Sequence, residues 1–60
     1  MMIQDDRVAR VVRQERGAWV VEIDSAVRSV EHVRGNARPV VGDLVEMRPG
    51  LETIDRILPR

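Results

Sequence analysis

The chain has 60 residues and no cysteine, so it can form one small domain that neither disulfides nor a cysteine-based zinc site stabilise. Ten basic and ten acidic residues leave no net charge, which argues against strong, sequence-independent binding of nucleic acid by the whole surface. Eleven residues are valine, a side chain that fits pleated, half-buried surfaces, so the composition favours an all-β domain.

The N-terminal residues 1–6, MMIQDD, contain neither the basic nor the apolar region of a secretory signal. No apolar run approaches the roughly 20 residues that a membrane-spanning helix needs. We therefore expect a cytoplasmic protein with no membrane partner. It would form a single domain over residues 1–60, with residues 1–6 as a loosely ordered tail.

The segment over residues 7–16, RVARVVRQER, carries an arginine at every third position and fits either a helix or a strand. Its valines have the spacing of one helix face, but valine-rich segments have only modest helix propensity. In a regular strand, Arg7 and Arg13 would share one face, and Arg10 and Arg16 would share the other. Periodicity alone leaves this segment open.

Four further strands follow in chain order, joined by short turns. They cover residues 18–24, 27–34, 44–48 and 51–60. The second of these needs a bulge near Ser29 to bring its valines to one face, and residues 35–43, rich in glycine and proline, form a connection. Five short strands with tight turns predict a small five-stranded barrel of the OB or SH3-like type, which closes its sheet.

No pattern in the chain is typical of an enzyme. There is no P-loop, no dinucleotide-binding glycine motif and no lysine. Ser29 and His32 would lie on opposite faces of a regular strand, which does not suit a nucleophile–base pair. We expect a protein that is not an enzyme and that holds no cofactor and no metal.

Trp19 is the only aromatic residue of the chain. Barrels that bind single-stranded nucleic acid stack bases on several aromatic side chains, so an inward position on a strand favours a core role for Trp19. RNA binding would then depend on arginine, which supplies every basic charge and matches phosphate with its planar fork of donors.

The second half of the chain carries an ordered set of motifs. Arg-Gly-x-x-Arg at residues 34–38 leads to Val-Gly-Asp-x-Val at residues 41–45, and Ile-Leu-Pro-Arg follows at residues 57–60. This order resembles the N-terminal domain of RsgA, the ribosome-small-subunit-dependent, circularly permuted GTPase. Residues 9–24 are similar to the first hairpin of that family, so the resemblance covers most of the chain and favours a strand over residues 7–16.

The resemblance implies an OB-fold that docks on the small ribosomal subunit and contacts its ribosomal RNA. The loops that flank the ligand face of OB barrels would place Arg16 and Arg48 beside the expected surface. The GTPase and zinc-binding parts of the family have no counterpart here, so hydrolysis is not implied. The expected phosphate contacts are Arg13, Arg16, Arg34, Arg38 and Arg48.

Two other interpretations remain open. A minimal or engineered β-barrel without a ligand of its own could form a weak homo-oligomer through an exposed strand edge, and the zero net charge and single aromatic residue fit this description. An OB protein similar to translation initiation factor 1 is a third interpretation, although that family has a stronger basic character.

Overall fold

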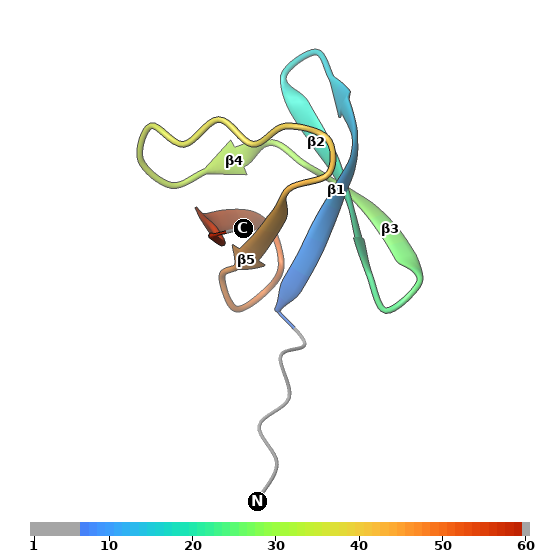
Figure 1. Ribbon diagram of the computed structural model, residues 1–60. Coiled ribbons are helices and arrows are strands. Elements are labelled where there is room, and N and C mark those ends of the chain that lie inside the picture. The colour runs from blue at the N-terminus through green and yellow to red at the C-terminus, as the bar shows by residue number, and fades with distance from the viewer. Residues whose placement is uncertain (1–6, 60) are drawn as a thin grey trace, which may run out of the picture.

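A computed structural model describes residues 7–59 of the chain. Every regular element in this range is a strand, and together the strands form one mixed sheet with the order β3-β2-β1-β5-β6-β4 (Figure 1). The strands are β1 (Val8–Glu15), β2 (Ala18–Ile23), β3 (Ala26–Val30), β4 (His32–Val33), β5 (Leu44–Met47) and β6 (Thr53–Ile57). The prediction of an all-β fold is confirmed, and the ambiguous segment 7–16 contains a strand. The tail expected at residues 1–6 lies outside the described residues.

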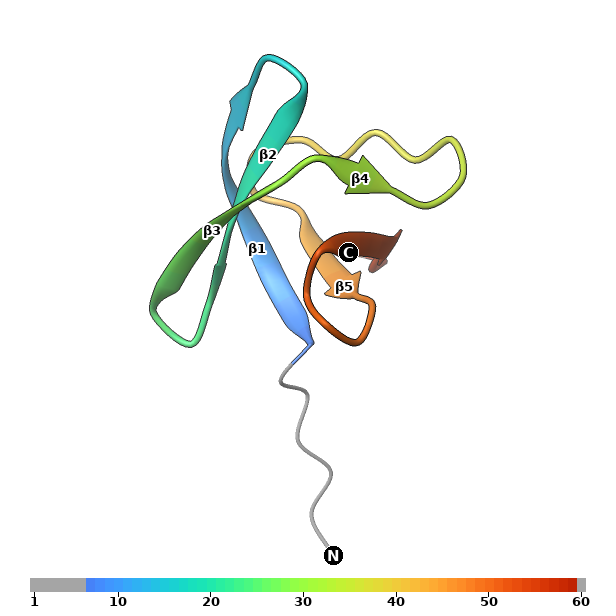
Figure 2. The ribbon, with the colours of Figure 1, turned by 180° about the vertical axis from the view of Figure 1, so that it is seen from behind.

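The sheet is strongly curved (Figures 1 and 2). Its two edge strands, β3 and β4, are neighbours in the chain. Strands β1, β2 and β3 form an antiparallel meander, β5 pairs antiparallel with β1 and β6, and β4 pairs parallel with β6. Only Glu31 separates β3 from β4, yet these two strands end the sheet order on opposite sides. The strand expected over residues 27–34 is therefore interrupted at Glu31 rather than bulged near Ser29, and the sheet is not closed.

A bulge in β1 changes the direction of its arginines. The register with β2 skips Val12, which makes Val12 the extra residue of the bulge. Arg10 lies opposite Glu22, and Arg13 lies opposite Val20. Val20 and Glu22 are two positions apart on β2, so their side chains lie on the same face of the sheet. Arg10 and Arg13 therefore share one face, whereas regular alternation places them on opposite faces.

A second bulge explains the three-residue spacing near the end of the chain. The register between β5 and β6 skips Asp55, so Asp55 and Arg56 both lie on the outer side of the sheet. Ile54 is fully buried and Ile57 packs against the same core. The spacing of these two isoleucines reflects a bulged strand and not a helix.

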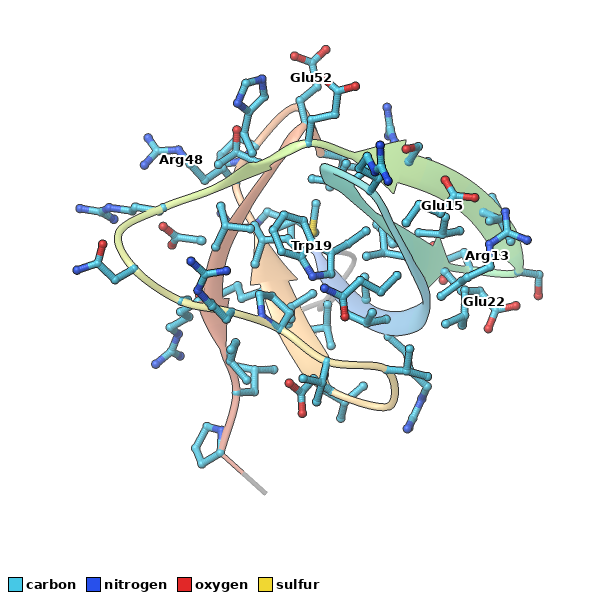
Figure 3. All side chains as sticks on the ribbon, turned by 90° about the horizontal axis from the view of Figure 1, so that it is seen from above. Arg13, Glu15, Trp19, Glu22, Arg48 and Glu52 are labelled. Atoms are coloured by element: carbon cyan, nitrogen blue, oxygen red, sulfur yellow. The ribbon has the colours of Figure 1, made fainter. Side chains whose placement is uncertain are left out.

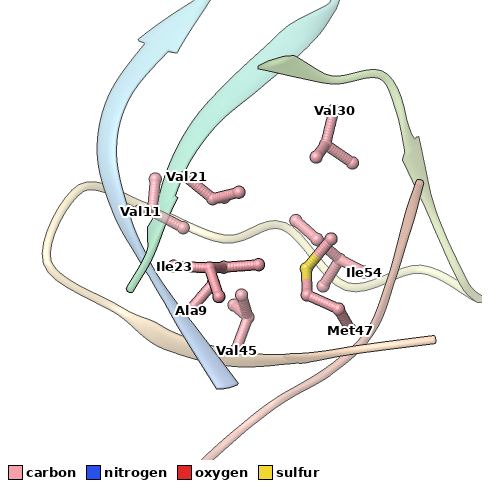
Figure 4. Close-up of a cluster of buried hydrophobic side chains, with 8 residues drawn as sticks. All are labelled: Ala9, Val11, Val21, Ile23, Val30, Val45, Met47 and Ile54. Atoms are coloured by element: carbon pink, nitrogen blue, oxygen red, sulfur yellow. The ribbon is translucent and has the colours of Figure 1, made fainter. Parts of the chain in front are cut away.

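The hydrophobic core lies inside the curved sheet (Figure 4). It consists of Ala9, Val11, Val21, Ile23, Val30, Val45, Met47 and Ile54. Half of these side chains are valine, as the composition led us to expect. No helix in residues 7–59 could cross a bilayer.

Candidate nucleic-acid interface

The Val-Gly-Asp motif fixes the end of the connection that joins β4 to β5. The Asp43 carboxylate, only 7% exposed, accepts a 2.9 Å hydrogen bond from the Val40 amide, and the Asp43 amide donates to the Val40 carbonyl at 3.0 Å. Gly42 has a φ of 98°, a region that glycine adopts without steric cost. Its amide donates to the Val11 carbonyl at 2.8 Å. This motif therefore positions the connection against β1.

Trp19 fixes the middle of the same connection. Its indole nitrogen donates a 2.9 Å hydrogen bond to the carbonyl oxygen of Pro39, and the Pro39 side chain is fully buried. Trp19 itself is half-buried at the start of β2 and packs only in part against the core. The rest of its side chain faces an open cavity.

This cavity lies between Trp19 and the connection and has a volume of about 440 Å³. Its lining residues are Trp19, Glu31, Val33, Gly35, Asn36, Ala37 and Arg38. In the view from above, Trp19 lies within the space that the strands and the connection enclose (Figure 3). The cavity therefore combines an aromatic wall with Arg38, one of the arginines expected to bind phosphate.

Two other expected arginines converge on Asp55. Nη1 of Arg34 lies 3.0 Å from Asp55 Oδ1, and Nη1 of Arg48 lies 3.9 Å from the same oxygen. Backbone hydrogen bonds position both arginines, because the Arg34 amide donates to the Ile54 carbonyl and the Arg48 amide to the Thr53 carbonyl. The side chains of Arg34 and Arg48 remain 66% and 51% exposed. These two guanidinium groups and one carboxylate together carry a net charge of +1.

Arg13 and Arg16 lie apart from this group. Arg13 forms a 2.8 Å ion pair with Glu15, and both side chains are exposed. Figure 3 shows Arg13 and Arg48 on opposite sides of Trp19. Arg16 belongs to the turn between β1 and β2, which lies at the opposite end of the molecule from the β5–β6 turn (Figures 1 and 2). The five expected arginines therefore do not form one surface.

Asp55 is not among the residues that the sequence predicts for the site. The three-residue spacing of Ile54 and Ile57 is the one signal for it, because a bulge between them turns the intervening residues outward. Arg56, the other intervening residue, forms a 3.0 Å ion pair with Glu46. Across residues 7–59, no cluster of three or more histidine, aspartate or glutamate side chains is suited to hold a metal ion.

No protein-family model matches the chain, and comparisons with curated proteins and with solved structures gave no match either. The site is therefore interpreted from its own geometry. That geometry places the exposed guanidinium groups of Arg34 and Arg48 around one carboxylate. Arg38, on the connection between β4 and β5, lines a cavity together with the indole ring of Trp19.

Proposed function

We propose that the chain binds RNA of the small ribosomal subunit through Arg34, Arg38 and Arg48, which we call the arginine face. The main support is the convergence of Arg34 and Arg48 on Asp55. Guanidinium groups held in place match phosphate oxygens with several donors each, and phosphate contacts supply a large share of the affinity for nucleic acids. The resemblance of the motif order to RsgA supports the small ribosomal subunit as the partner.

The sheet order supports an OB-type barrel as the finer description of the fold. If β3 and β4 are two halves of one strand interrupted at Glu31, five strands remain. The first half of that strand neighbours β2 and the second half neighbours β6, so the order returns to its starting strand. A partly open five-stranded barrel of the OB type has this arrangement and binds oligonucleotides.

Cosedimentation with purified small ribosomal subunits tests the proposal. We expect the wild-type protein to sediment with the subunits at low salt. The double variant R34Q/R48Q should remain in the supernatant because it loses two phosphate contacts. The matched control R13Q/R16Q removes two exposed arginines that lie apart from the arginine face, and it should still sediment. Wild-type protein that stays in the supernatant, or a double variant that sediments as well as wild type, would contradict RNA binding by this face.

A free strand edge favours a second candidate function, which is self-association. In the described part of the chain, β3 pairs only with β2, and Val27 on β3 is 60% exposed. Unpaired backbone groups on such an edge can pair with the same edge of a second copy. Light scattering decides this question: a discrete oligomer that V27K dissociates would favour self-association, and a monomer at all concentrations tested would exclude it.

A further inference from the structure

We infer that the cavity beside Trp19 holds one unpaired nucleobase, so that the RNA on the arginine face is single-stranded at this point. This base site presupposes the RNA binding proposed above and specifies its substrate class. The cavity volume of about 440 Å³ lies within the range of about 300–1,000 Å³ that is usual for small-ligand sites. Its open side leaves room for the ribose and phosphate outside.

The indole ring is held as a rigid platform. Core packing restrains one part of Trp19, and the 2.9 Å hydrogen bond to Pro39 restrains the nitrogen edge. Because this bond already uses the indole N–H, the ring offers the cavity its apolar surface. A ring that is ordered before binding loses little conformational entropy when a base stacks on it.

The other walls complement the two parts of a nucleotide. Val33 and Ala37 are apolar, and Arg38 brings a planar cation that can stack on a base or bind its phosphate. The carboxylate of Glu31 accepts hydrogen bonds only, and each of the four RNA bases carries at least one N–H donor. Arg34 directly precedes the lining residue Gly35, so the arginine face continues from the cavity.

A base inside a duplex cannot enter such a cavity, because both of its faces are covered by stacking and its edge is paired. An unpaired base in a loop or a single strand has a free face and a free edge, and aromatic side chains stack on bases of this kind. The site therefore distinguishes single-stranded RNA from duplex RNA without reading a specific sequence.

Fluorescence measures occupancy of this site directly, because Trp19 is the only aromatic residue of the chain. The probes are a single-stranded heptaribonucleotide of mixed sequence, an abasic sugar-phosphate strand of the same length, and an RNA duplex of the same sequence. We expect saturable quenching by the heptaribonucleotide alone. The abasic strand should bind about tenfold more weakly, a factor that corresponds to the loss of one stacked base.

A cavity-filling variant tests the site without removing an arginine. A37L places a larger side chain in the cavity, and its matched control A26L adds the same group at an exposed position on β3. We expect A37L to abolish quenching and to bind the heptaribonucleotide no better than the abasic strand, while A26L behaves as wild type. If A37L does not fold, the comparison of the three probes on wild-type protein still shows whether the cavity binds a base.

The outcomes separate this base site from the proposed function. Salt-dependent binding of all three probes with equal affinity and no quenching would overturn the base site while RNA binding by the arginine face stands. Equal quenching by the heptaribonucleotide and the abasic strand would also overturn it, because the base would then contribute nothing. Failure of every probe to bind at low salt would overturn both proposals.

Discussion

The indole nitrogen of Trp19 donates a hydrogen bond of 2.9 Å to the carbonyl oxygen of Pro39. The two residues are 20 positions apart in the chain, and this bond joins the start of β2 to the middle of the connection between β4 and β5. The connection carries Arg34 and Arg38, so the bond helps to position two of the three residues of the arginine face. The same bond orients the ring that forms one wall of the cavity.

Replacing Trp19 with phenylalanine keeps an aromatic ring and removes the N–H donor. We expect W19F to lose about 1–2 kcal/mol of unfolding free energy, because the Pro39 carbonyl loses its partner and the ring is smaller. In a domain of this size the melting temperature should fall by about 5–15 °C, measured by far-UV circular dichroism. A melting temperature equal to that of wild type would show that the bond does not stabilise the connection.

Two neutral variants of Asp43 distinguish the contribution of its hydrogen bond from that of its charge. D43A leaves the Val40 amide without the carboxylate that accepts its hydrogen bond, and we expect a loss of about 1–3 kcal/mol. D43N retains an oxygen acceptor at the same position, so its loss should be clearly smaller. Urea denaturation of both variants measures the difference. Equal destabilisation would mean that the charge of Asp43, and not its hydrogen bond, maintains the turn.

The turn between β2 and β3 is a site where stability can be gained. Asp24 and Ser25 both have positive φ, at 51° and 68°, a conformation that costs free energy for residues other than glycine. Two-residue hairpin turns of this kind favour the sequence Asn-Gly. We expect the double variant D24N/S25G to gain about 1 kcal/mol of unfolding free energy, measured as a raised melting temperature. An unchanged or lowered value would contradict this description of the turn.

If the arginine face binds RNA as proposed, Asp55 competes with the RNA phosphates for Arg34 and Arg48. D55N removes the negative charge between the two guanidinium groups, and we expect it to raise RNA affinity about three- to tenfold at low salt. Folding should change by less than about 1 kcal/mol, since exposed ion pairs contribute little to stability. The matched control E15Q removes the partner of Arg13, outside the arginine face, and should leave affinity within about twofold of wild type. Weaker RNA binding by D55N would contradict the competition.

The all-β class could be predicted from the sequence because valine and short, turn-bounded segments favour strands. The three-residue spacings could not be assigned from periodicity, since a bulge adds one residue to a strand of period two and thereby resembles a helix. Val12 and Asp55 are the residues added in this way. The path of residues 27–34 also depends on pairing partners that are distant in the chain, because β3 pairs with β2 and β4 pairs with β6.

Only part of the candidate site could be predicted from the sequence. Arg34 and Arg38 could be selected by motif order, and Arg48 by its expected place in a barrel loop. Their grouping, however, depends on how β4 and β5 flank β6. The sequence does not identify Asp55 as a site residue, because its outward position depends on the bulge in β6. Arg13 and Arg16 share the chemistry of the other arginines and lie on other parts of the surface, which residue type alone does not reveal.

The salt dependence of RNA binding tests the arginine face most directly. If three phosphates are contacted, the logarithm of the association constant should fall with the logarithm of salt concentration with a slope of about −2, given about 0.7 for each contact to a single strand. The variant R34Q/R38Q/R48Q should show a slope near zero, whereas the control R10Q/R13Q/R16Q, which removes three arginines from β1 and the turn after it, should keep the wild-type slope. A flat response of the wild-type protein, or a slope that only the control variant reduces, would contradict RNA binding by this face.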